Sequence, residues 1–252
     1  MQDAKREILA RVAQGTLTPQ EAALELLELG PETAAPAIEA EAMPPSDLAR
    51  VRLVTSMGSV TVIGDESVRE AVADGPHQAR REGDTLVVES TLDDEVGFRF
   101  GRIGFGIDVR DLKLLVRMNP ALALDVQVQA GTLRIQGIRA PIRAEVQAGS
   151  TKIEGFSAPL DLDCQAGSVK ARGRLTGGSS KISCQAGSVK LELDPDSNVK
   201  ITARTSLGKV SLPGVPAVSR IGGGTAQAQV GDGAGTLDIV AELGSVMVGV
   251  AE

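Results

Sequence analysis

The chain has 252 residues, of which 42% are hydrophobic and 23% charged, and its net charge is −7. This composition is that of a folded protein, and no apolar run approaches the roughly 18 residues that a membrane helix needs. With 29 Gly, 4 Phe, 1 His and neither Tyr nor Trp, the chain lacks most of the side chains that enzymes use for catalysis or for holding sugars and bases.

Residues 1–30 have a helical pattern. Apolar residues at helical spacing define a first helix, and Thr18, Pro19 and Glu21 form a capping box that starts a second one, which ends at Gly30. We expect a small helical hairpin that docks on the rest of the chain, on a partner or on a second copy. Its first residues lack the apolar core of a secretory signal peptide, which predicts a cytoplasmic protein.

Residues 31–46 are rich in Pro and acidic residues, which is typical of an extended, semi-rigid linker. The chain after this linker repeats itself. Four segments align without gaps on a central Gly, at spacings of 18, 18 and 20 residues: Gly131, Gly149, Gly167 and Gly187. Degenerate copies surround Gly58, Gly208 and Gly244. A fixed period of this length is the signature of a solenoid.

Alternating apolar residues give the register of each copy. The positions five, three and one residues before the Gly are apolar or small and are expected to face inward; the last of these positions holds Ala130, Ala148, Ala166 and Ala186. The apolar set returns two and four residues after the Gly, so the inward parity shifts there, and a corner with positive φ at the Gly explains the shift. A third side is expected at residues 138–142 and 156–160.

The sequence therefore predicts an all-β fold over residues 47–252, a parallel β-solenoid of roughly ten coils with about 18–20 residues in each. Stacked at ~4.8 Å per strand, these coils would form a rod roughly 50 Å long. Whether residues 65–118 form regular coils or an excursion is left open.

These features resemble a known family. The Gly-anchored coils, the strand at residues 112–120 and the Gly-rich segment before the last coil are similar to the bacterial putative-adhesin domain family, a β-solenoid domain of unknown function. The resemblance covers about residues 48–252. Residues 1–30 are similar to the SHOCT-like helical hairpin that precedes this domain in some cytoplasmic members. The resemblance implies the fold, oligomerisation through the hairpin and a link to cell-envelope stress, and it implies no catalytic residues.

A row of cations is expected on the outside of the coils, three residues after each corner Gly. We call it the basic ladder, and it consists of Arg134, Lys152, Lys170 and Lys190. Residues 126–193 carry 9 Lys or Arg and 5 Asp or Glu, a net charge of +4, which leaves −11 for the rest of the chain. Such a stripe fits a phosphate-bearing polymer or an anionic membrane surface. The alternative is a solvated face neutralised by Glu154, Glu192 or the acidic linker.

Two further sets are assigned to structure. An outward row of amides two residues before the Gly is expected to form hydrogen bonds from coil to coil, and it consists of Gln129, Gln147, Gln165 and Gln185. Cys164 and Cys184 occupy one inward position in adjacent coils, within bridging range. In a reducing cytosol we expect them to be free core thiols rather than a disulfide or a metal site.

Residues 96–106 interleave aromatic rings with cations among glycines, and the residues concerned are Phe98, Arg99, Phe100, Arg102 and Phe105. We call them the Phe/Arg segment. Such a pattern can stack on unpaired bases or enter a membrane interface. The alternative is a flap that packs these rings onto the solenoid.

The sequence favours a non-enzymatic structural protein that forms a homo-oligomer through the hairpin or through its terminal coils, because the last strand, Val246–Val250, lacks an obvious cap. The alternative is a binding module for a polyanion or an anionic membrane surface, through the basic ladder and the Phe/Arg segment. A carbohydrate-active enzyme is not expected, because no outward row is acidic. We expect no catalytic residues, cofactor, metal or small-molecule substrate.

Overall fold

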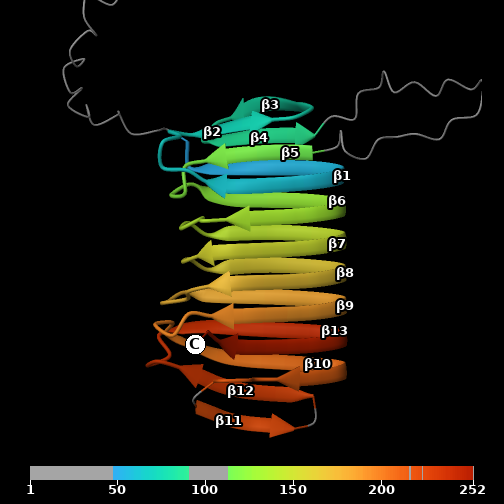
Figure 1. The fold of residues 1–252 in the computed structure, drawn as a ribbon, viewed down its shortest axis with the longest axis vertical. Helices are drawn as coiled ribbons and strands as arrows, with labels where there is room; N and C mark the ends of the chain where they lie inside the picture. Colours follow the sequence, from blue (N-terminus) through green and yellow to red (C-terminus); the bar gives the residue numbers. More distant parts are fainter. Residues whose placement is uncertain (1–47, 91–112, 216, 223, 252) are drawn as a thin grey trace, which may run out of the picture. The chain divides into compact units, whose positions relative to one another are not determined.

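The computed structural model describes residues 48–215, 217–222 and 224–251, except for 91–112. The described residues contain no helix, and their 13 strands form one sheet in the order β11-β12-β10-β13-β9-β8-β7-β6-β1-β4-β3 (Figure 1). Off this path, β5 pairs with β1, and β2 pairs with β5. Most neighbouring strands are parallel. The predictions of an all-β fold and of parallel stacking are confirmed.

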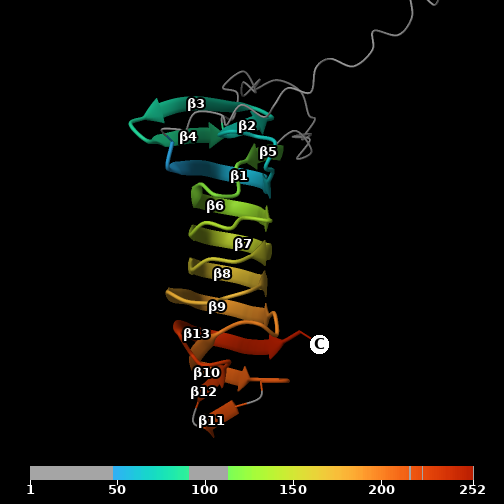
Figure 2. The same cartoon turned by 90° about the vertical axis from the view of Figure 1, so that its left-hand side faces the viewer.

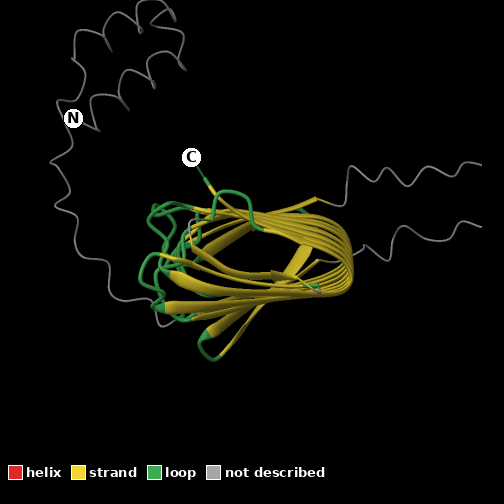
Figure 3. Cartoon of the chain, turned by 90° about the horizontal axis from the view of Figure 1, so that it is seen from below, coloured by secondary structure: helices red, strands yellow, loops and turns green. Residues whose placement is uncertain are grey.

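The long strands share one design. In the described part of the chain there are seven of them: β1 (Arg50–Gly64), β6 (Ala123–Gln136), β7 (Ile142–Phe156), β8 (Leu160–Gly173), β9 (Ser179–Leu193), β10 (Val199–Ser211) and β13 (Gly235–Val250). Each one folds back on itself near its middle (Figure 3). We call the half before the central Gly the first arm and the half after it the second arm. Each long strand forms one level, and the levels together form the parallel stack.

A column of glycines forms the bend of these strands. The central Gly residues pair with one another in register from level to level, and their φ angles lie between 123° and 156°. A Cβ added at Gly149 would overlap the carbonyl oxygen of Gly131 on the next strand. Backbone therefore packs on backbone here, which confirms the predicted corner and explains why Gly recurs at each of these levels.

The core lies between the two arms. In β6, Val126 and Val128 are buried in the first arm, and Leu133 and Ile135 in the second. The apolar positions five and three residues before the Gly are thus confirmed as inward. The position one residue before it is not, since Ala148, Ala166 and Ala186 are exposed and Ala130 is half-buried. The reason is that the chain already turns at this residue, so its side chain points out of the bend.

The expected third side is a short connection instead of a strand. Residues 137–141 and 157–159 have no strand pairing, although Ile138 is fully buried. The backbone N–H groups of Arg139 and Ala140 both donate to the carbonyl oxygen of Pro120. The prediction of three similar sides was wrong because the burial of an apolar side chain in a loop gives the same sequence signal as a strand.

Antiparallel strands occupy both ends of the parallel stack (Figure 2). At one end, β4 (Thr85–Ser90) and β5 (Lys113–Met118) pair in parallel with the two arms of β1, while β3 (His77–Glu82) and β2 (Ala71–Asp74) pair antiparallel with β4 and β5. At the other end, β12 (Thr225–Val230) is antiparallel to β10 and to β11 (Ala217–Gly222). Residues 65–118 thus include one level built from two separate arms.

The last strand does not lie at the end of the stack. β13 pairs in parallel with β9 on one side and with β10 on the other, so it occupies the level between two strands that precede it in sequence. The final strand is therefore not the outermost level, because a strand that follows in sequence need not stack on the outside. Its last residues, 248–250, pair with β9 alone among the described residues.

The predicted SHOCT-like hairpin, the linker and the Phe/Arg segment lie outside the described residues. Across the described ranges, no helix has the length and hydrophobicity needed to span a bilayer.

Candidate binding surface

The basic ladder lies on the outer face of the second arms. Neighbouring strands β6 to β9 place its four members directly opposite one another in register, as Arg134–Lys152, Lys152–Lys170 and Lys170–Lys190. All four are exposed. The structure thus brings together the four cations that the repeat predicts, at a spacing of ~4.8 Å from strand to strand.

Two members of the ladder are neutralised by neighbouring acids. Lys152 Nζ lies 2.9 Å from Glu154 Oε1, and Lys190 Nζ lies 2.8 Å from Glu192 Oε1. The hydrogen bonds from Lys152 and then from Gln136 lower the pKa of Glu154, and the hydrogen bond from Lys190 lowers that of Glu192. Neutralisation by Glu154 and Glu192, which the sequence offered as an alternative, therefore operates at these two levels.

The remaining cations of this face are not paired. Arg134 and Lys170 form no ion pair with any described residue, and neither does Arg172, which the sequence reasoning missed. Arg172 of β8 stands in register between Glu154 and Glu192, at the position where its neighbours carry an acid. The outer side of the second arm of β8 therefore carries cations and no acid.

Beside the basic ladder runs a row of hydroxyl groups that the sequence reasoning also missed. We call it the hydroxyl ladder; it lies one residue after the Gly and consists of Ser59, Thr132, Ser150, Ser168, Ser188 and Ser245. The Oγ1 atom of Thr132 and the Oγ atom of Ser150 are 3.4 Å apart. This row could have been predicted from the sequence, because the residue after the Gly is Ser or Thr in all four aligned repeats.

The row of glutamines lies on the first arms, close to the bend. All four side chains are exposed and in adjacent levels, but no hydrogen bond joins one amide to another within the described ranges. The predicted coil-to-coil amide bonds are therefore absent, because these side chains extend into solvent at the bend. They line a groove of about 390 Å³ together with Glu145 and Asp163.

The two cysteines lie side by side in the core. Cys164 of β8 and Cys184 of β9 are directly opposite in register, and both are buried free thiols, as predicted. Burial raises the pKa of both thiols, and for Cys164 it reaches about 11. The thiolate, which is the reactive form, is therefore strongly disfavoured in the folded protein.

We expect both thiols to be unreactive towards a disulfide reagent at pH 8 until the protein unfolds, since burial raises the pKa of each. For Cys164 the rise in pKa from 9.0 to about 11 lowers the thiolate fraction about a hundredfold. The thiol of Cys164 ionises at a lower pH in the unfolded state than in the folded state. Its contribution to the stability of the folded protein is therefore fully present below pH 9 and is lost as the pH rises from 9 to 11. Absorbance of the released thiol with and without denaturant checks the first point. Rapid labelling of the native protein would contradict it.

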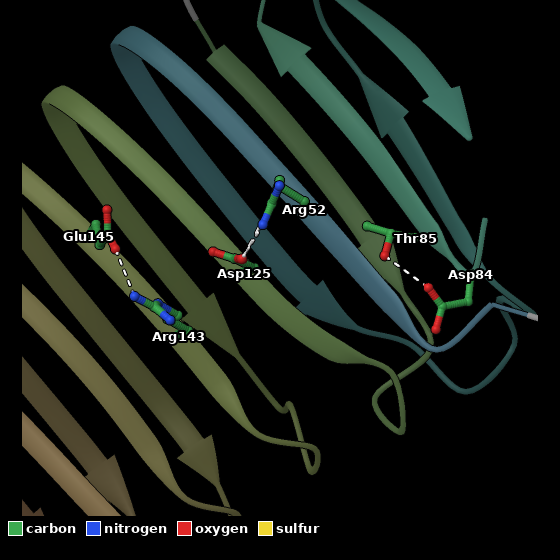
Figure 4. A network of polar contacts seen from close by, with 6 residues as sticks. All are labelled: Arg52, Asp84, Thr85, Asp125, Arg143 and Glu145. Atoms are coloured by element: carbon green, nitrogen blue, oxygen red, sulfur yellow. Dashed lines mark hydrogen bonds and ion pairs between the residues drawn. The ribbon is translucent and has the colours of Figure 1, made fainter. Parts of the chain in front are cut away.

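The first arms carry a second pattern that the sequence reasoning missed. Charges of alternating sign face one another from level to level, and the row, here called the alternating-charge ladder, reads Arg52, Asp125, Arg143, Asp161, Lys181 and Asp238. The Arg52 Nη2 atom lies 3.2 Å from Asp125 Oδ2, and Arg143 Nη2 lies 3.1 Å from Glu145 Oε1 (Figure 4). Glu145 and then Asp161 raise the pKa of Arg143.

This face also holds neighbouring carboxylates. Glu145 of β7 and Asp163 of β8 are directly opposite in register on the outer side of the first arms. The sequence reasoning missed this pair, although both residues stand four positions before the Gly in the aligned repeats. A groove of about 460 Å³ beside them is lined by members of the alternating-charge ladder, among them Arg52 and Asp125.

Comparison with known proteins adds little. No protein-family model matches the chain, and no curated protein is significantly similar to it. Among solved structures it is similar to a putative cell adhesion protein from Clostridium sporogenes ATCC 15579, with 12% sequence identity and a TM-score of 0.46 over 82% of this chain and 95% of that one.

Proposed function

We propose that the protein is a non-enzymatic structural protein, a β-solenoid scaffold that associates with further copies of itself. Residues 48–252 would be the scaffold, with the fold of the putative-adhesin domains that its repeat resembles, and residues 1–30 would provide one contact between copies. The continuous core along the parallel stack supports this proposal. Repeat proteins of this kind present extended, regular surfaces.

The observation that carries the proposal is an apolar pair at one end of the parallel stack. Leu207 of β10 and Leu243 of β13 are directly opposite in register at the bend, and their side chains are 68% and 51% exposed. The strands β6 to β9 have Ala at the same position. Beyond the bend, Ser206–Ser211 of β10 pairs with β13 alone among the described residues. An apolar surface beside an unpaired strand edge favours association.

We expect deletion of residues 1–46 to leave the parallel stack folded and to lower its association state. The reason is that the stack has a core of its own, whereas the predicted hairpin is too small to be secure without a partner. Size-exclusion chromatography with light scattering measures the mass, with refractive index as the concentration signal because the chain contains no Tyr or Trp. Circular dichroism checks that the strands persist.

A second variant distinguishes association through the apolar pair from association through residues 1–30. Leu207→Asp places a charge on the apolar pair without touching residues 1–46, and Ala166→Asp makes the same change at the same position of β8. We expect Leu207→Asp, but not Ala166→Asp, to lower the association state further in the truncated chain. A full-length protein that is a monomer at all concentrations would refute self-association, and an unfolded truncated chain would refute the tethered hairpin.

A further inference from the structure

The second arms combine two kinds of anion-binding group in a regular array. On each of β6 to β9 a hydroxyl and a cation stand two residues apart on the outer side, so the hydroxyl ladder and the basic ladder run side by side along the parallel stack. Two residues of a strand span about 6.6 Å, and adjacent levels are ~4.8 Å apart. Hydroxyl and cationic donors therefore form two parallel rows that extend over four levels.

The centre of this strip is β8. Ser168, Lys170 and Arg172 all lie on the outer side of its second arm, and this arm contains no acid. Lys152 and Lys190 flank Lys170 but are each engaged by a glutamate. A small cavity of about 160 Å³ lies among these cations and the two glutamates. The cations of this strip that form no ion pair with a described residue are thus Arg134, Lys170 and Arg172, and Arg172 also lowers the pKa of its neighbours Glu154 and Glu192.

We propose that this strip binds a linear phosphate-bearing polymer that runs along the parallel stack. Phosphate groups fit best because several oxygens on each can accept hydrogen bonds from a hydroxyl and a cation at once. The narrowness of the strip favours a linear chain over a membrane surface. Phe156, the aromatic residue in the described part of the chain, is buried and cannot anchor in a lipid interface. This binding goes beyond the scaffold role and does not depend on self-association.

The probe is end-labelled inorganic polyphosphate, and the readout is fluorescence anisotropy of the full chain at several salt concentrations. We expect log K to fall linearly with log salt, since binding releases counterions. The triple variant Arg134→Gln, Lys170→Gln, Arg172→Gln should bind at least about tenfold more weakly. The slope of its log K against log salt should be smaller in magnitude by about 2 to 3. The double variant Glu154→Gln, Glu192→Gln should bind more tightly with a steeper slope, because it frees Lys152 and Lys190.

A matched triple variant on the first arms provides the control. Arg143→Gln, Lys181→Gln and Lys200→Gln remove the same charge from exposed positions of the opposite face and should leave the affinity unchanged. An equal loss of polyphosphate affinity in the two triple variants would show that binding depends only on the total charge of the protein, and this would overturn the proposal. So would the absence of polyphosphate binding at low salt. Binding to vesicles with one quarter phosphatidylglycerol, without binding to polyphosphate, would overturn it in favour of a membrane surface.

Discussion

Replacing Gly167 by Ala should unfold the parallel stack or destabilise it by more than about 4 kcal/mol, since backbone clashes and strain are among the few causes of effects this large. Its φ is 142°, and an added Cβ would overlap the carbonyl oxygen of Gly149 and lie 2.8 Å from its carbonyl carbon. The obstacle is backbone of the neighbouring level, which cannot rotate away as a side chain would. Relief therefore requires the two strands to separate.

Substitutions at two other glycines distinguish the cost of the backbone clash from the cost of the backbone conformation. Gly83, in the turn between β3 and β4, has a φ of 61° and nothing within 4 Å of an added Cβ, so Gly83→Ala should cost about 1 kcal/mol from conformation alone. Gly177 has equally open space, and Gly177→Ala should change stability by less than about 0.5 kcal/mol. Urea unfolding followed by circular dichroism gives all three values. A Gly167→Ala protein as stable as Gly83→Ala would show that the levels are not in backbone contact.

The second large effect is expected in β13. Ile239 is fully buried between β9 and β10, so Ile239→Asp places a carboxylate in the core without a partner and should cost more than about 4 kcal/mol. The adjacent residue Val240 points outward and is 39% exposed, so Val240→Asp introduces the same charge on the same strand at little cost. The comparison tests the register of β13, because a shift by one residue would exchange the two outcomes.

Hydrogen exchange tests the position of the same strand. The backbone amides of β13 from Thr236 to Met247 should be as strongly protected as those of β8, since both segments have parallel partners on each side. An outermost strand would exchange on alternate residues much faster. Rapid exchange along β13 would therefore contradict its place between β9 and β10.

The local geometry of the repeat could be predicted because each element of it has a signal in the sequence. The shift in apolar parity at Gly131 and its equivalents predicts the bend, and the 18-residue period predicts which side chains share a row. The four cations of the basic ladder were found in this way. The exposed alanines before the Gly could not be assigned, since a small side chain is compatible with both the core and the outside of a bend.

The order of the levels has no such signal. The segments around Gly187, Gly208 and Gly244 resemble one another, so the sequence does not say which of them are neighbours. That β13 lies between β9 and β10 depends on how the antiparallel pair β11–β12 turns the chain back. The alternating-charge ladder and the neighbours Glu145 and Asp163 differ in this respect, because their members occupy one position relative to the Gly and could have been read from the aligned repeats.

The alternating-charge ladder has a consequence for how the chain avoids misfolding. The cores of β6 to β9 are so alike that a strand could skip one level and still find a matching apolar surface. Skipping β7 would set Asp125 against Asp161, and skipping β8 would set Arg143 against Lys181. Like charges directly opposite on neighbouring strands repel one another. The alternation thus favours docking of the next level over docking of the one after it as the stack grows.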